Sequence, residues 1–185
     1  MKAGARVAGV AESFSDDEST LAAAVVRADR SVDGFAFGRC TVGGTDATER
    51  VGDLLGRLDR EDLRAAMVAG VAPAWFNVLD LHALVERAAL PVLSVSFEAS
   101  EGLEPALRRE FDGERLETRL ATYRRQPERR AVDVDGGTVW VRAVGLDRAD
   151  AAGLVRAFTP EGGRPEPVRV ARLAARAAEA FRADS

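Results

Sequence analysis

The chain has 185 residues, a formal net charge of −4, 46% hydrophobic residues and 30% charged residues. This composition excludes a disordered chain, and no apolar run reaches the roughly 20 residues of a membrane-spanning helix. A single cysteine, Cys40, excludes an internal disulfide framework and a cysteine-based zinc site. Because Met1–Gly4 leads into a strand-like run without a signal-peptide core, we expect one cytoplasmic domain over residues 1–185.

The first third of the chain has the pattern of an antiparallel meander. Short runs rich in β-branched residues or with alternating polarity predict strands over residues 6–11, 21–27 and 35–42. The polar, acidic segment Ser13–Thr20 and the turn residues Asp29–Gly34 are interpreted as surface connections. Gly43 and Gly44 end the meander, and apolar residues at helical spacing predict a helix over Asp46–Leu58.

The rest of the chain alternates strands and helices. Further strands are predicted over residues 63–69, 91–97, 131–134 and 138–143. Further helices are predicted over residues 73–89, 104–109, 114–125, 147–158 and 168–182. Pro73 suits the first turn of its helix, and Asp135-Gly136-Gly137 is a hairpin signal. A meander followed by strand–helix units predicts an α/β fold, a mixed sheet with helices on its faces.

The densest local signal is the segment Thr41–Glu49. Asp46 and Glu49 stand three residues apart at the start of a predicted helix. This spacing fits a capping box, in which Asp46 is the N-cap. The alternative is a carboxylate pair for metal binding or acid–base chemistry beside Gly43-Gly44, where glycines let the backbone approach a ligand closely.

Other polar residues adjoin buried elements. Asn77 and Asp80 share one face of the predicted helix 73–89, where they either hold a neighbouring loop or line a pocket. Glu12 follows the first strand, which suits a site or the start of a loop. Cys40 and His82 are each the only residue of their kind, but no oxyanion signature accompanies them, which favours a packed cysteine over a nucleophile–base pair.

Positive charge is concentrated in the middle of the chain. Lys2 is the only lysine among 26 basic residues, and residues 106–130 carry eight arginines against five acidic side chains. Such a region either forms a solvated helix face or faces phosphate groups.

Several segments together resemble one known family. They are Val7–Phe14, Asp33–Phe35, Thr41–Thr48, Phe76–Asp80, Pro91-Val92 and Pro165–Ala171. In this order they are similar to the archaeal family catalogued as domain of unknown function 99, a distant relative of endonuclease V, over essentially the whole chain. The arginine-rich, lysine-poor composition suits a haloarchaeal member. The resemblance implies a ribonuclease H-like, endonuclease V-related fold.

The resemblance also implies where a metal site would lie, because endonuclease V enzymes bind Mg²⁺ through carboxylates and cut beside deaminated purines. The five positions that match their functional residues are Ala11, Glu49, Ala69, Phe97 and Arg172. Only Glu49 keeps a carboxylate. A hard cation needs several oxygen ligands, so the resemblance implies that the usual site is lost.

We therefore expect a protein without the usual metal-dependent endonuclease activity and without a cofactor, associated with nucleic acid and not with a membrane. The arginines expected to contact nucleic acid are Arg124, Arg125, Arg169 and Arg172. One alternative is a divergent nuclease with a relocated catalytic carboxylate site, the only case in which Mg²⁺ is expected; its residues would be Glu12, Asp46, Glu49 and Asp80. Another is a scaffold protein that acts through the apolar helix 73–89. The oligomeric state is not determined by the sequence.

Overall fold

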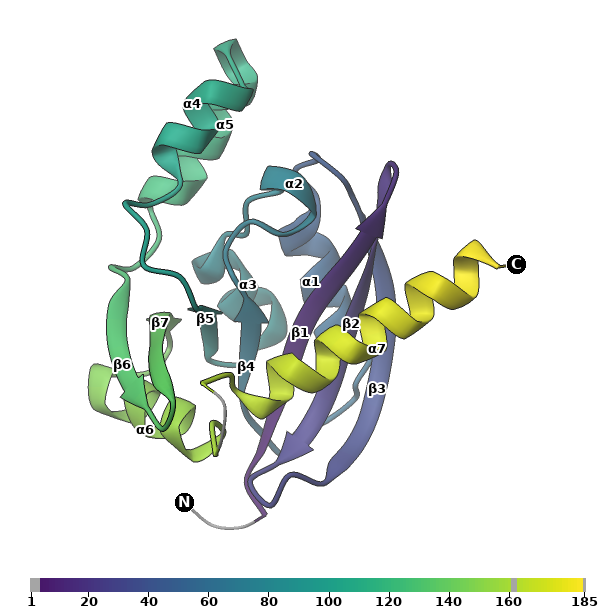
Figure 1. Cartoon of the computed structure of the whole chain (residues 1–185), viewed down its shortest axis with the longest axis vertical. Coiled ribbons are helices and arrows are strands. Elements are labelled where there is room, and N and C mark those ends of the chain that lie inside the picture. Colours follow the sequence, from purple (N-terminus) through teal and green to yellow (C-terminus); the bar gives the residue numbers. More distant parts are fainter. Residues whose placement is uncertain (1–3, 161–162, 185) are drawn as a thin grey trace.

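A computed structural model describes residues 4–160 and 163–184. Within this part of the chain, seven strands form one sheet in the order β3-β2-β1-β4-β5-β7-β6 (Figure 1). The strands are β1 (Arg6–Ser15), β2 (Glu18–Arg27), β3 (Val32–Thr41), β4 (Leu63–Ala69), β5 (Val92–Ser96), β6 (Arg130–Val134) and β7 (Gly137–Val144).

Strand β1 lies inside a mixed sheet, next to its central strand β4. It pairs antiparallel with β2 and parallel with β4. Strands β4 and β5 are parallel, and β7 runs antiparallel to both β5 and β6. The predicted meander corresponds to β1–β3, and the predicted hairpin at Asp135–Gly137 joins β6 to β7. The predicted α/β fold with a mixed sheet is confirmed.

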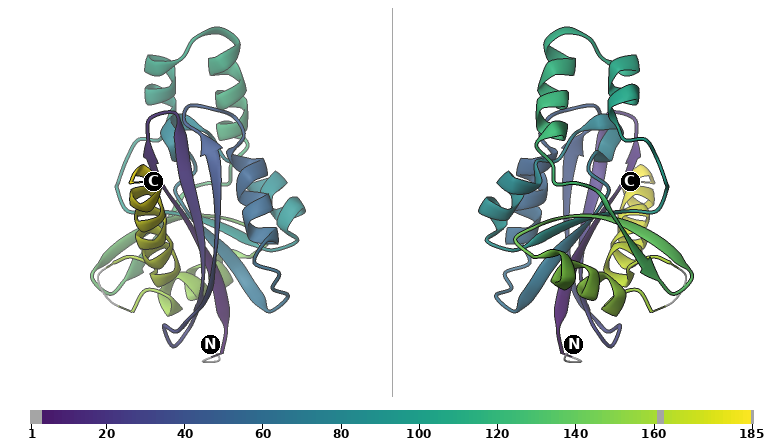
Figure 2. Two further views of the ribbon diagram at one scale, coloured as in Figure 1. Left: turned by 90° about the vertical axis from the view of Figure 1, so that its right-hand side faces the viewer. Right: turned by 90° about the vertical axis from the view of Figure 1, so that its left-hand side faces the viewer.

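Helices cover both faces of the sheet. They are α1 (Ala47–Gly56), α2 (Pro73–Phe76), α3 (Leu81–Ala88), α4 (Glu104–Glu110), α5 (Gly113–Arg124), α6 (Arg148–Ala157) and α7 (Glu166–Ala183). Helices α1 and α3 pack on one face, and α6 and α7 pack on the other (Figure 2). The pair α4–α5 projects beyond the end of the sheet as a helical arm. No helix among the described residues is long and apolar enough to cross a bilayer.

The start of α7 lies directly on β1. A Cβ atom placed on Gly9 would lie 2.0 Å from the carbonyl carbon and oxygen of Pro167. Only glycine permits this approach, which sets α7 diagonally across β1 and β2. Gly9 therefore positions the residues of α7 that face the sheet.

The predicted connection Ser13–Thr20 was wrong. Strands β1 and β2 continue through it as a ladder from Ser13 paired with Thr20 to Ser15 paired with Glu18, and the turn consists of Asp16 and Asp17 alone. Asp16 has a φ of 58°, a left-handed conformation that aspartate tolerates better than most residues. Polar composition indicated exposure correctly, but exposed strand ends carry the same composition as a loop.

The predicted continuous helix over residues 73–89 was also wrong, because it is broken between α2 and α3. Ala74, Trp75 and Phe76 have φ values of 47°, 53° and 62°. The carbonyl of Ala74 accepts a hydrogen bond from the Gly43 amide at 2.7 Å instead of continuing a helix. Contacts between distant parts of the chain outweigh the local helical pattern here.

Candidate functional site: an arginine pocket on one face and carboxylates on the other

Four of the five positions matched to endonuclease V gather on the α7 face of the sheet. Ala69, Phe97 and Arg172 line one pocket of about 270 Å³. Ala11 lies in a small apolar cluster with Ala171 of α7, and Ala69 packs against that cluster. The fifth position, Glu49, lies exposed in the first turn of α1, which packs on the opposite face. Four matched positions therefore lie together on the α7 face, whereas Glu49, the one that carries a carboxylate, lies on the other face.

The pocket is lined by cationic and apolar side chains, and none of its lining residues in the described part of the chain is acidic. They are Ala69, Phe97, Arg164, Val168, Arg169, Arg172, Leu173 and Arg176. We call this site the arginine pocket. The Arg164 guanidinium lies 4.8 Å from the centre of the Phe97 ring. Arg169 is held by Glu166, whose pKa is lowered by this partner. Arg172 and Arg176 form no hydrogen bond or ion pair with any described residue, so their guanidinium groups are available to an anion.

Glu12, the carboxylate next to Ala11 in the sequence, lies on the opposite face of the sheet from the arginine pocket. Ala11 faces α7, whereas Ala8 and Val10 face α1. Glu12 shares the face of Ala8 and Val10, because successive side chains on a strand point to opposite sides. A shift of one residue therefore moves a carboxylate to the other side of the sheet. Glu12 does not replace the missing ligand at Ala11.

Asp46 is fully engaged in holding the chain around it. Its carboxylate accepts hydrogen bonds from the Thr41 amide at 3.1 Å and from Asn77 Nδ2 at 2.7 Å. Burial alone would raise the pKa of Asp46, but the hydrogen bonds from Asn77 and Thr41 outweigh burial and lower it. It makes no capping bond to α1, so the predicted capping box was wrong.

Asn77 explains this arrangement. Its side chain is completely buried, accepts a hydrogen bond from the Ala47 amide at 2.9 Å and donates to the Thr41 carbonyl at 2.8 Å. Asn77 therefore accepts a hydrogen bond from the first backbone amide of α1, although it belongs to another segment of the chain. Of the two readings of Asn77 and Asp80, holding a neighbouring loop is correct for Asn77, although the two residues do not share a helix face.

The remaining predicted catalytic carboxylates have separate surroundings. Glu12 accepts a hydrogen bond from Ser19 Oγ at 2.6 Å. Asp80 is the N-cap of α3, accepting from the amides of His82 and Ala83, and pairs with Arg125. Glu49 is exposed. Among residues 4–160 and 163–184, no group of three or more His, Cys, Asp or Glu side chains could hold a metal ion.

Glu12 and Asp46 do share one neighbour, Cys40. Burial raises the pKa of the Cys40 thiol to about 12, and the charges of Asp46 and Glu12 add to the effect. The thiol therefore stays protonated at neutral pH. His82 is exposed on α3, where its ring contacts the Arg125 carbonyl, so Cys40 and His82 form no nucleophile–base pair.

The arginines predicted to bind nucleic acid differ in how free they are. Arg124 forms two hydrogen bonds of 2.9 Å with Glu104. Arg125 pairs with Asp80, and Arg169 with Glu166. Of these four arginines, only Arg172 forms no hydrogen bond or ion pair with a described residue. The sequence analysis did not single out Arg164 or Arg176. Arg176 lies four residues after Arg172 and seven after Arg169, a helical spacing that could have identified it. Arg164 precedes the helix, so this spacing gives no signal for it.

The comparison with known proteins agrees with this architecture. The sequence model of the family described as Endonuclease dU matches residues 3–179. The chain belongs to the Endonuclease dU family. A protein named UPF0215 from Pyrobaculum calidifontis is 36% identical over 170 residues, covering 90% of this chain and 92% of that protein. One from Thermococcus gammatolerans is 36% identical over 159 residues, covering 85% and 80%.

Solved structures extend the similarity of this Endonuclease dU family member to endonuclease V. A protein of unknown function from Archaeoglobus fulgidus has a TM-score of 0.82 at 25% identity, covering 94% of this chain and 98% of that one. Human endonuclease V has a TM-score of 0.64 at 15% identity, covering 98% and 87%. Endonuclease V from Ciona intestinalis, solved with a 24mer DNA that contains an inosine, has a TM-score of 0.64 at 13% identity, covering 96% and 86%. These likenesses show the fold.

The residues on the α7 face do not fit the divalent cation that the endonuclease V resemblance implies. Ala11, Ala69 and Phe97 offer no side-chain oxygen, and the guanidinium of Arg172 repels a cation. The chemistry of this pocket suits an anion instead.

Proposed function

We propose that this member of the Endonuclease dU family binds DNA through the arginine pocket, with the phosphate backbone on α7, and that no metal-dependent cleavage takes place there. The single observation that carries the proposal is the pocket's composition: Arg172 and Arg176 are unpaired in the described chain and no lining carboxylate opposes them. Guanidinium groups bind phosphate with paired N–H donors.

Two further features support a nucleic acid rather than a free anion. Phe97 and Arg164 form a stacked pair at the pocket, a surface on which an unpaired base can lie. The family is named for an endonuclease at deoxyuridine, and a protein of the same fold from Ciona intestinalis holds DNA with an inosine. We therefore infer that the preferred DNA contains a deaminated base.

The test is DNA binding by fluorescence anisotropy at about 50 mM and 200 mM salt, since phosphate contacts make affinity fall steeply with salt. Strands with one deoxyuridine, one inosine or no modified base are compared. The double variant Arg172→Glu/Arg176→Glu should lower affinity by at least tenfold and reduce the salt dependence by about one unit of slope per lost contact.

Arg64→Glu is the matched control. Arg64 is exposed in β4, about 16 Å along the strand from Ala69 at ~3.3 Å per residue, where it lines a different hollow together with residues of α6. Its substitution changes net charge without touching the pocket and should cost far less affinity. Equal losses for both variants, or no binding at low salt, would refute the proposal.

A second candidate, strand cleavage by the carboxylates on the α1 face, is favoured by the proximity of Glu12 and Asp46 to Cys40 and by the family's name. The test is scission of deoxyuridine-containing DNA in a magnesium buffer by the parent chain and by Glu12→Gln and Glu49→Gln. Cleavage that either substitution abolishes would establish this candidate, and its absence would leave binding as the function.

A further inference from the structure

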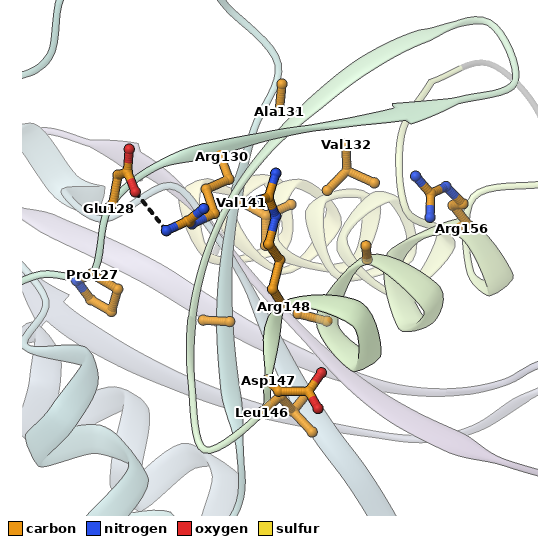
Figure 3. A pocket seen from close by; sticks show the side chains of 13 residues that line it. Pro127, Glu128, Arg130, Ala131, Val132, Val141, Leu146, Asp147, Arg148 and Arg156 are labelled. Carbon is orange, nitrogen blue, oxygen red and sulfur yellow. Dashed lines mark ion pairs between the residues drawn. The ribbon is translucent and has the colours of Figure 1, made fainter.

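A second pocket lies between the β6–β7 hairpin and helix α6 (Figure 3). It shares no lining residue with the arginine pocket. Its volume is about 390 Å³, within the range of small-molecule sites. We propose that this hairpin pocket binds a nucleoside monophosphate. The inference does not rest on the proposed DNA binding, because the two pockets share no residue.

The pocket exists because small side chains face one another across the gap between sheet and helix. Ala143 of β7 and Ala151 and Ala152 of α6 line the pocket, and Val132 and Val141 line it from the sheet. Alanines at these positions leave a slot with aliphatic walls on both sides. Such a slot suits a flat ring, which buries both of its faces at once.

Positive charge surrounds the opening of this slot. Arg130 comes from the start of β6, Arg148 from the first turn of α6 and Arg156 from its last turn, and Figure 3 shows the three side chains around the apolar walls. Arg130 pairs with Glu128 at 2.7 Å, and Arg156 donates to the Asp133 carbonyl at 3.1 Å. Arg148 forms no hydrogen bond or ion pair with any residue that the structure describes, and it extends from α6 toward the hairpin.

The remaining acid of the rim does not neutralise Arg148. Asp147 is the N-cap of α6 and accepts a hydrogen bond from the Asp150 amide at 2.8 Å. An unpaired guanidinium at the mouth of an apolar slot fits one phosphate group attached to a flat ring. The Glu128–Arg130 pair places a hydrogen-bond acceptor beside several donors, the pattern that the edge of a nucleobase requires.

The same chemistry occurs in a free nucleotide and in the 5′-phosphorylated end of a DNA strand. Calorimetric titration of the full chain with deoxyuridine monophosphate tests the first source. Comparison of 5′-phosphorylated and 5′-hydroxyl oligonucleotides tests the second. Binding of the free nucleotide, or tighter binding of the phosphorylated end, supports the proposal and identifies the source.

The variants assign any binding to this pocket. Arg148→Ala, an exposed substitution, should weaken binding by about tenfold, the effect of losing one charged hydrogen bond. Ala152→Phe should abolish binding by filling the slot. Arg176→Ala, in the other pocket, is the control and should change nucleotide affinity less than twofold.

Four outcomes would overturn the proposal. These are no binding of either source, unchanged affinity in Arg148→Ala, equal binding of inorganic phosphate alone, and equal binding of unphosphorylated deoxyuridine. Because Arg176→Ala reports on DNA binding by the arginine pocket, failure of the nucleotide proposal is distinguishable from failure of the proposed function.

Discussion

Arg119 Nη2 lies 3.0 Å from the carbonyl oxygen of Gly44, although the two residues are 75 positions apart. The same guanidinium donates to the carbonyls of Gly43 at 2.5 Å and Phe76 at 3.0 Å. It lies 4.0 Å from the centre of the Phe111 ring. One buried side chain of the helical arm thus fixes both the loop that precedes α1 and the left-handed segment of α2.

These contacts predict that Arg119→Ala lowers the free energy of unfolding by about 2–4 kcal/mol. The carbonyls of Gly43, Gly44 and Phe76 lose a charged donor, and the Phe111 ring loses its cation–π contact. Urea denaturation followed by circular dichroism measures the loss. Arg115→Ala is the control: Arg115 lies 5.1 Å from the same Phe111 ring but is exposed. Equal effects of the two substitutions would contradict the role of Arg119.

The contact between β1 and α7 yields a second prediction. Gly9→Ala should destabilise the protein by about 1–3 kcal/mol or more, since the new methyl group must displace the backbone of Pro167. Thermal denaturation gives the change in stability. It should also weaken DNA binding, because α7 carries three arginines of the arginine pocket.

Gly56→Ala is the matched control for Gly9→Ala. Gly56 ends α1, and a Cβ atom there would meet nothing within 4 Å. The same chemical change should therefore leave stability unchanged or raise it by about 0.5 kcal/mol. Tolerance of Gly9→Ala with unchanged stability would show that α7 does not depend on this close approach.

The sequence predicts most elements because their patterns are local. Strand β4 begins and ends where the apolar run Leu63–Ala69 predicts, and the meander follows from alternation and turn residues. The break between α2 and α3 could not be predicted, because Arg119 and Gly43 supply the hydrogen bonds that replace the helix. Likewise, local spacing made Asp46 a capping residue, whereas Asn77 from another element takes that place.

The candidate site, too, could be predicted from the sequence only in part. The resemblance matched Ala69, Phe97 and Arg172 to one site, and the structure places them around one pocket, whereas Glu49, matched to the same site, lies on the opposite face. The contribution of Arg164 depends on how its loop returns to the sheet, which no sequence spacing encodes. The separation of Ala11 from Glu12 by the sheet could have been read from strand alternation alone.

Asp33 gives a prediction for acid stability. Hydrogen bonds from Arg27 and Arg6 lower the pKa of Asp33 to about 2. Since the pKa of an aspartate in an unfolded chain is about 3.9, the stabilisation is fully present above that value and is lost as the pH falls toward 2. Asp33→Asn should therefore be less stable at neutral pH and lose less stability between about pH 5 and 2 than the parent chain. Parallel losses of stability in both chains on acidification would contradict this role.

Cys40 gives a prediction for thiol chemistry. Because burial, followed by the charges of Asp46 and Glu12, raises the thiol pKa to about 12, almost no thiolate forms in the folded protein near neutral pH. A disulfide exchange reagent at about pH 8 should leave the folded chain unmodified over a time in which a free thiol reacts completely. In denaturing guanidinium chloride the chain's one cysteine should react at once, which serves as the control. Rapid labelling of the folded chain would show that Cys40 is accessible as a thiolate and would reopen the α1 face as a site of nucleophilic chemistry.

The raised thiol pKa also predicts how stability depends on high pH. The free energy of unfolding should decline as the pH rises from about 9 toward 12, because only the unfolded chain ionises its thiol freely in that interval.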